Sequence, residues 1–212
     1  MERFYRFAGF TCRISGKTED LFEEDGVLAP FRVDGDAFDH SIEFAFVSSL
    51  PEPEGELVFS SGHRCVFQNK NAYLRCVGEV RQSPDGAYMQ IRRDGAHSRI
   101  QVLRSAIPDR IMPRLVLNAL EAEHHIVQRG GFLLHASFVR WKDKSILFTA
   151  PSGTGKSTQA ELWRCHRNAE IINGDRVAVT MSDQGAMSWG IPYCGTSGIC
   201  KNAQLPVAAI LS

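Results

Sequence analysis

The residues with the clearest chemistry lie in one glycine-rich segment, Ala150-Pro-Ser-Gly-Thr-Gly-Lys-Ser-Thr158. An apolar run, 145–149, precedes this segment, and a helix-prone run, 158–163, follows it. A strand, a glycine-rich turn, a lysine, a hydroxyl and a helix, in that order, are typical of a phosphate-binding loop. Gly153 and Gly155 let backbone N–H groups turn towards an anion, and the start of the helix adds its positive end. The segment therefore predicts binding of nucleotide phosphates.

Individual residues of this loop have distinct expected roles. Lys156 can reach the outer phosphates, and the Ser157 hydroxyl can ligate Mg²⁺. Ala150 stands where the usual pattern has its first glycine, but the later residues make the anion-binding turn. The full set of expected nucleotide-binding residues is Ser152, Gly153, Thr154, Gly155, Lys156, Ser157 and Thr158.

Two further candidates lie on either side of the loop. Asp175 follows an apolar run, 19 positions after Lys156. Its carboxylate could hold Mg²⁺ together with Ser157, although Asn-Gly-Asp is also ordinary turn chemistry. His135 lies 21 positions before Lys156 among apolar neighbours. It is either a core histidine with satisfied hydrogen bonds or a group that orients a phosphate acceptor.

Three weaker candidates are Arg176, Lys201 and the stretch Gly195-Thr-Ser-Gly198. A basic side chain near the γ-phosphate can stabilise a transition state, and such a turn can offer N–H and hydroxyl donors to a phosphate. Each feature is also typical of a solvated side chain or a plain turn.

Composition narrows the class of protein. The chain has 212 residues, 43% of them hydrophobic, and 24 basic and 24 acidic residues give zero formal net charge. This balance gives no reason to expect a nucleic-acid or membrane partner. No apolar run of about 18 residues and no signal-like start occurs, so a cytoplasmic location is expected. The six cysteines contain no Cys-x-x-Cys pair and are expected to be reduced core or loop thiols.

The spacing of apolar residues predicts the supporting elements. Short strand-like runs separated by turn signals make 1–105 β-rich, with an antiparallel meander. Helical spacing covers 108–129, ends at two glycines and leaves His124 and His125 on the surface. Runs at 132–141 and 145–149 then predict an antiparallel hairpin leading into the loop, and 170–179 reads as strand, turn, strand. The last apolar run, 205–211, predicts a buried strand that runs directly into the C-terminus, as in a domain cut short there.

The fold class expected from these elements is α+β or mixed α/β. Residues 1–105 form the β-rich region, and 106–212 form a phosphate-loop domain.

Three motifs together resemble the HPr kinase/phosphorylase-like superfamily, which also contains the PEP carboxykinases. They are Gly131-Phe-Leu-Leu-His-Ala-Ser137, the loop itself and Asn173-Gly-Asp-Arg-Val177. The resemblance covers 106–212, about half of the chain, and is nearest to small HPr kinase-like proteins that are mostly uncharacterised. It implies a P-loop kinase domain that commonly forms homo-oligomers. In such a domain Lys156 would hold the β- and γ-phosphates, Ser157 and Asp175 would hold Mg²⁺, and His135 would act at the acceptor.

The chain departs from that family at one position. HPr kinases carry two adjacent acidic residues, the first of which is the general base, whereas this chain has Gly174 followed by Asp175. Asp175 or His135 would then be the base.

The function expected is therefore an ATP-dependent, Mg²⁺-assisted phosphotransferase that acts on a hydroxyl of a peptide, protein or small molecule. GTP is an alternative donor, and HPr itself is not implied as the acceptor. A non-catalytic nucleotide-binding or regulatory module is the alternative function, and the β-rich half could recruit a partner.

Overall fold

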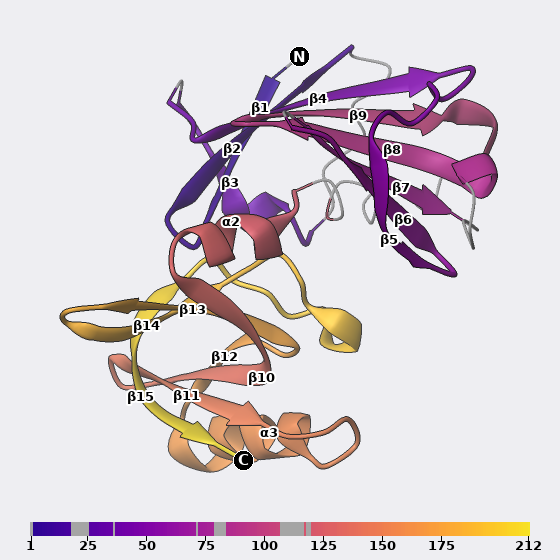
Figure 1. The fold of residues 1–212 in the computed structure, drawn as a ribbon. Coiled ribbons are helices and arrows are strands. Elements are labelled where there is room, and N and C mark those ends of the chain that lie inside the picture. The colour runs from indigo at the N-terminus through magenta and orange to yellow at the C-terminus, as the bar shows by residue number, and fades with distance from the viewer. Residues whose placement is uncertain are drawn as a thin grey trace. The chain divides into compact units, whose positions relative to one another are not determined.

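The computed structural model describes residues 2–17, 26–35, 37–70, 72–78, 84–106, 117 and 120–212. It divides into two compact units, and each unit combines separate stretches of the chain (Figure 1). The first unit contains Met1–Tyr5, Thr11–Glu23 and Asp34–Leu120, and the second contains Arg6–Phe10, Glu24–Val33 and Glu121–Ser212. The boundary expected after residue 105 stays a prediction. Half of the helix expected at 108–129 lies outside the described residues, and its described part contains α2 (Ala122–Gln128).

A nine-stranded sheet forms most of the N-terminal half of the chain. Its strand order is β3-β1-β2-β4-β9-β8-β7-β6-β5. The strands are β1 (Glu2–Phe7), β2 (Phe10–Gly16), β3 (Arg32–Val33), β4 (His40–Val47), β5 (Glu56–Ser61), β6 (Arg64–Gln68), β7 (Tyr73–Gly78), β8 (Ala87–Asp94) and β9 (His97–Leu103). Short 3-10 turns lie at Ala29–Phe31, Pro84–Gly86 and Arg104–Ala106.

The pairing in this sheet corrects one expectation. The strands from β5 to β9 do form an antiparallel meander, but β4 runs parallel to both of its neighbours, β2 and β9. The region is therefore not purely antiparallel. The first three residues of β4 are all buried, which is the pattern of a parallel strand covered on both faces.

The second unit is built on a closed sheet. Its strands are β10 (Gly131–Trp141), β11 (Lys144–Thr149), β12 (Glu170–Asn173), β13 (Arg176–Ser182), β14 (Gly185–Gly190) and β15 (Gln204–Leu211). The order is β11-β15-β14-β13-β10-β12, and β11 also pairs with β10. That last pairing closes five strands into a barrel and leaves β12 attached beside β10.

The long strand β10 makes the closure possible, because its two halves pair with different partners. Gly131 to His135 pair with β13, and from Ala136 onward β10 pairs with β11. The antiparallel β10–β11 hairpin confirms the arrangement expected to lead into the loop. The strand, turn and strand expected at 170–179 are likewise confirmed by β12 and β13.

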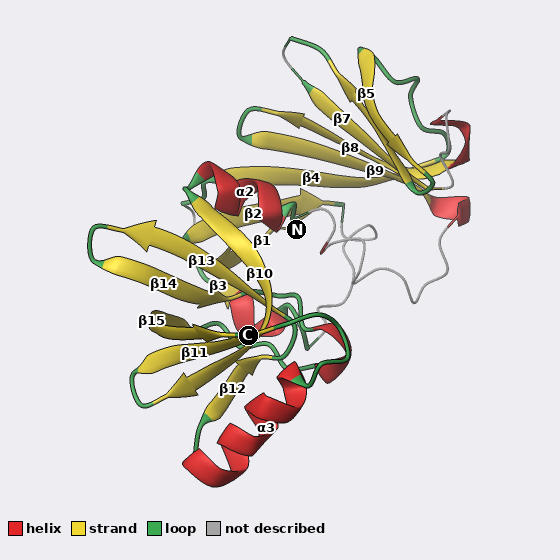
Figure 2. Ribbon diagram, turned by 60° about the horizontal axis from the view of Figure 1, so that its bottom comes forward, coloured by secondary structure: helices red, strands yellow, loops and turns green. Residues whose placement is uncertain are grey.

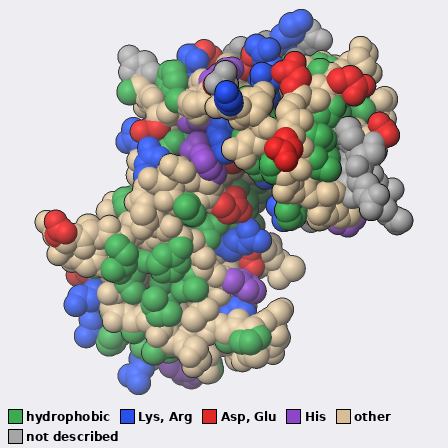
Figure 3. Space-filling model, viewed as in Figure 1, with side chains coloured by type: hydrophobic (Ala, Val, Ile, Leu, Met, Phe, Trp, Pro, Cys, Tyr) green, Lys and Arg blue, Asp and Glu red, His purple; other side chains and the backbone are tan. Residues whose placement is uncertain are grey.

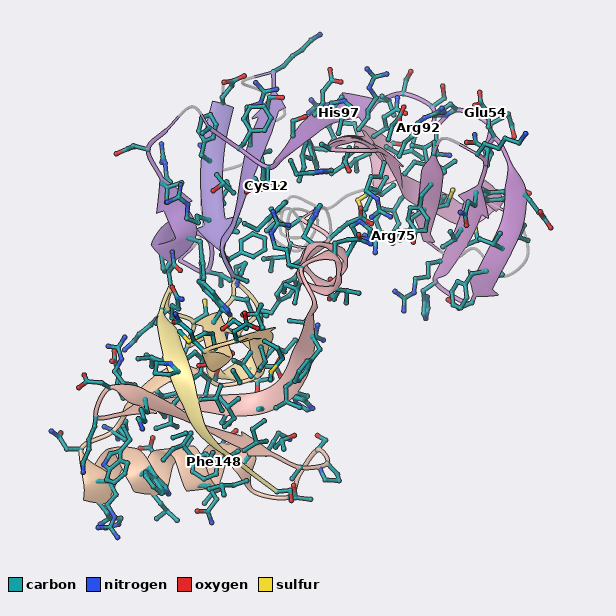
Figure 4. All side chains as sticks on the ribbon, turned by 60° about the vertical axis from the view of Figure 1, so that its left-hand side comes forward. Cys12, Glu54, Arg75, Arg92, His97 and Phe148 are labelled. Atoms are coloured by element: carbon teal, nitrogen blue, oxygen red, sulfur yellow. The ribbon has the colours of Figure 1, made fainter. Side chains whose placement is uncertain are left out.

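Both faces of the β10–β11 hairpin are buried. Phe138 and Leu147 belong to a cluster inside the closed sheet, whereas Val139 and Phe148 face α3 (Lys156–Arg167) on the outside. Figure 2 shows α3 lying along this part of the sheet, and Figure 4 shows Phe148 on the side of the strands that meets the helix. The helix therefore has a firm support directly after the glycine-rich loop.

The expected α+β or mixed α/β class, with its phosphate-loop kinase domain, is wrong. The structure is 54% strand and 16% helix, and it consists of a nine-stranded sheet and a five-stranded barrel. In the described part of the second unit, one helix of 12 residues follows the loop, and every later element except a single 3-10 turn is a strand. A strand–loop–helix motif therefore does not by itself imply further strand–helix units.

Two smaller expectations also fail. His125 is buried, with 6% of its surface exposed, because its ring stacks on Phe10 with centroids 4.0 Å apart. The final strand β15 exists, but only Leu205 in it is buried. Within the described residues, no helix combines the length and the apolar character needed to cross a membrane.

Candidate functional site

The glycine-rich loop has the geometry of an anion-binding turn. β11 ends at Thr149 and α3 begins at Lys156. Gly153 and Gly155 have φ angles of 82° and 98°, in the region that glycine adopts without strain. The Thr154 hydroxyl donates a hydrogen bond to the Pro151 carbonyl at 2.7 Å, so the loop is closed on itself.

The N-terminus of α3 is available to an anion. Gly155 is its N-cap, no side chain caps it, and its first turn contains no acidic residue. Basic side chains gather instead in its last turn, at Arg164, His166 and Arg167. The first N–H groups of a helix have no partner within the helix. The unpartnered N–H groups and the absence of an acidic side chain in the first turn therefore favour an anion at the loop end of this helix.

Lys156 bends back over the loop. Its Nζ donates to the carbonyl oxygens of Ala150 and Pro151, at 2.9 and 3.2 Å. Both acceptors are neutral, and hydrogen bonds to a phosphate oxygen are stronger than bonds to a carbonyl. A bound phosphate can therefore replace these two contacts favourably.

Asp175 is held by a network centred on Asn173. The buried Asn173 side chain accepts hydrogen bonds from the backbone N–H groups of Asp175 and Arg176, at 2.9 and 3.0 Å, and donates to the Ile191 carbonyl at 2.9 Å. The N–H of Ala136 donates to the Asp175 carbonyl at 3.0 Å, which ties this turn to β10. The position of Asp175 is thus fixed by backbone contacts and not only by its own side chain.

His135 and Asp175 face each other. His135 Nε2 lies 3.4 Å from Asp175 Oδ1, and Arg176 Nε lies 3.4 Å from Asp175 Oδ2. The His135 side chain is 54% exposed and that of Asp175 is 28% exposed. The exposure of His135 argues against the core-histidine reading of the sequence.

One cavity brings most of the expected residues together. It has a volume of about 680 Å³ and contains His135, Lys156, Ser157 and Asp175 in its lining. The other lining residues are Ser152, Gly153, Gly155, Thr158, Gly174, Gly195, Thr196 and Ser197. Figure 3 shows acidic, basic and histidine side chains gathered on one side of this unit.

Several candidates lie elsewhere. Thr154 lines a second cavity of about 310 Å³, which also touches Gly155 and Lys156. Arg176 contacts Glu123 at 3.5 Å as well as Asp175, and Lys201 binds Glu170 at 2.7 Å. The two basic side chains are thus engaged in ion pairs, and neither is among the residues that line the larger cavity.

The turn at Gly195–Ser197 packs more tightly against residues 174 and 175 than its sequence indicates. A Cβ atom added at Gly195 would lie 2.7 Å from Asp175 Cγ, and one added at Gly174 would lie 2.2 Å from Ser197 Oγ. The sequence marked this turn only as a weak phosphate-donor candidate. The two glycines are the only sign of this close packing in the sequence. They could not be interpreted there, because the contacts join segments that are distant in the sequence.

The residues of the larger cavity are compatible with Mg²⁺. Ser157 and Asp175 supply a hydroxyl and a carboxylate, which are hard oxygen donors. The described residues contain no cluster of three His, Cys, Asp or Glu side chains that could hold a metal alone. Mg²⁺ commonly keeps water and phosphate ligands beside one or two carboxylates, so this short donor set suits it.

No family model matches the chain, and no curated protein matches it significantly. The likeness to HPr kinase-like proteins therefore rests on the three motifs quoted above and stays a prediction.

Proposed function

We propose that this protein is an ATP-dependent, Mg²⁺-assisted phosphotransferase that acts on a hydroxyl of a peptide, protein or small molecule. The observation that supports this most directly is the cavity in which the glycine-rich loop and Asp175 line the same space. A phosphate cradle alone requires only the loop, whereas phosphoryl transfer also requires a carboxylate and a place for the acceptor.

The roles follow from the chemistry of each group. The N–H groups of the loop and of the first turn of α3 would bind the phosphates, and Lys156 would exchange its carbonyl partners for the outer phosphate oxygens. Ser157 and Asp175 would hold Mg²⁺, which neutralises charge that develops on the transferred group when it is bound.

The acceptor proton would go to the pair formed by Asp175 and His135. Their 3.4 Å separation allows the imidazole to support the carboxylate, and both groups reach solvent-accessible space inside the cavity. Because Gly174 supplies no second carboxylate, this pair would take the role of the general base.

The experiment uses the full chain, Mg²⁺, γ-labelled ATP and serine-bearing peptides. We expect Lys156→Ala to weaken nucleotide binding, and Asp175→Asn to lower transfer by about a hundredfold or more while the nucleotide still binds. Asp143→Asn is the matched control, because Asp143 is an exposed turn residue between β10 and β11 and does not line the cavity.

The outcomes separate the two functions expected from the sequence. Binding of ATP without transfer or hydrolysis would refute the phosphotransferase function and support the non-catalytic nucleotide-binding module. Absence of binding, with Lys156→Ala behaving as the unaltered chain does, would refute both. Repeating the binding measurement with GTP decides which nucleotide is used.

A cytoplasmic location and a homo-oligomeric state belong to the same proposal. None of the six cysteines takes part in a disulfide, as suits a reducing compartment. Sedimentation of the purified chain tests the oligomeric state.

A further inference from the structure

A residue with a hydroxyl side chain lines the same cavity as the phosphate loop. Thr196 is the middle residue of the 3-10 turn Gly195–Ser197, and it lines the cavity together with Lys156, Ser157 and Asp175. Thr196 is exposed. The chain thus presents its own alcohol at the site where a phosphate acceptor is needed.

The turn holds Thr196 close to Asp175. The approach of Gly195 to Asp175 is so tight that a Cβ atom at 195 would lie 2.8 Å from Asp175 Oδ1. Gly195 and Gly198 have φ angles of 54° and 65°, so the backbone on each side of Thr196 adopts a conformation that favours glycine. Thr196 therefore directly follows the residue packed on the carboxylate.

The two hydroxyls of the turn differ in their hydrogen bonds. Ser197 Oγ donates to the Cys194 carbonyl at 2.7 Å and accepts from the Ile199 N–H at 3.2 Å, so it maintains the turn. The Thr196 hydroxyl has no hydrogen-bond partner among the described residues. An acceptor must give up its proton and change its partners during transfer, and Thr196 can do so without opening the turn.

We propose that Thr196 is a self-phosphorylation site, modified within the same molecule by ATP bound at the loop. The inference rests on the proposed phosphotransferase function. A bond forms between Thr196 Oγ1 and the γ-phosphorus, and the bond from that phosphorus to the oxygen bridging to the β-phosphate breaks. ADP leaves, and the hydroxyl proton passes to the Asp175 carboxylate.

The test is to incubate the full chain with Mg²⁺ and ATP, with and without serine-bearing peptides, and to follow protein-bound phosphate. Intact mass and phosphopeptide mapping are expected to locate one phosphoryl group on Thr196. Thr196→Val, which keeps the shape of the side chain, is expected to lose this label, whereas Thr196→Ser is expected to keep it. Nucleotide affinity of the Thr196→Val chain shows that its site is intact.

The outcomes distinguish this inference from the function on which it rests. Nucleotide binding and transfer to added peptides, with no phosphate on the chain, would overturn the inference alone. A phosphate mapped to Ser197 or to another residue, or a labelling rate constant that rises with protein concentration, would also overturn it. Absence of nucleotide binding and of all transfer would overturn both.

Discussion

Replacing Gly174 by alanine tests the packing of the site directly. A Cβ atom at this position would lie 2.2 Å from Ser197 Oγ and 2.6 Å from Ser197 Cβ. Both distances are far below normal contacts, so Ser197 or the backbone at 174 must move. Gly174 does not have a positive φ, so the cost comes from this collision and not from backbone strain.

The magnitude follows from what Ser197 holds. Moving it disturbs its hydrogen bonds with Cys194 and Ile199, each worth about 0.5–1.5 kcal/mol. Gly174 is itself fixed, since its N–H donates to the Ile199 carbonyl at 3.3 Å. Overpacking costs about 1–3 kcal/mol, and the entropic gain of a Gly→Ala change offsets about 0.4–1 kcal/mol. We expect Gly174→Ala to lower the free energy of unfolding by about 2 kcal/mol.

Urea unfolding followed by tryptophan fluorescence measures this loss of stability in the second unit. The chain has three tryptophans, Trp141, Trp163 and Trp189, and all of them belong to the second unit. Their emission therefore reports the unfolding of the unit that contains the site.

A double-mutant cycle identifies the cause. Ser197→Gly removes both atoms that the new methyl group would meet, so Gly174→Ala should cost little in that background. An equal cost of Gly174→Ala with and without Ser197→Gly would refute the steric argument. The same reasoning predicts that restoring a second carboxylate by Gly174→Asp alone destabilises the protein and does not raise activity.

Two further predictions concern the support of the site. Asn173→Ala should lower the free energy of unfolding by about 3 kcal/mol, because three hydrogen bonds of a fully buried side chain are lost; an unchanged urea midpoint would contradict this. The pKa of Glu170 is lowered, chiefly by its hydrogen bond to Lys201, with Arg140 adding to the effect. The pKa of Glu170 is lower in the folded state than in the unfolded state, so the hydrogen bonds of its carboxylate contribute stability at neutral pH. This contribution is lost as the pH falls through the folded-state pKa. We therefore expect Glu170→Gln to cost at most about 1 kcal/mol at pH 7 and clearly less at a pH below the folded-state pKa, in urea titrations at both pH values; a larger cost at the lower pH would contradict the sign.

The local structure around the loop could be predicted from the sequence because its signals are local. The apolar runs before Lys142 and after Lys144 predicted the hairpin, and the glycines at 153 and 155 predicted the turn. Such signals depend on residues a few positions apart, and the structure keeps them.

The fold class could not be predicted in the same way, because it depends on which strands pair. β15 pairs in parallel with β11, and β10 divides its pairing between β13 and β11. Neither choice leaves a pattern in the strands themselves. His125 was misjudged for a similar reason, since its partner Phe10 is far away in the sequence.

The candidate site, like the fold, could be predicted only in part from the sequence. Lys156, Ser157, Asp175 and His135 were expected from motifs and line a common cavity. Thr196 lines that cavity because residues 195–197 pack against residues 174–175. The spacing of these segments in the sequence does not predict that they meet.

The closure of the sheet through β11 and β15 also has a consequence for the order of folding. The strand that carries the loop is completed by a neighbour from far along the chain, and Ser145 binds the Pro206 carbonyl across 61 positions of sequence. Contacts of such separation form late, since the intervening chain must be ordered first. On a ribosome, residues near 206 are made well after residues 144–158, so β11 stays unpaired on that side while the loop is already synthesised. Phosphate binding should therefore appear only in the final stage of folding, and its onset would report that the barrel has closed.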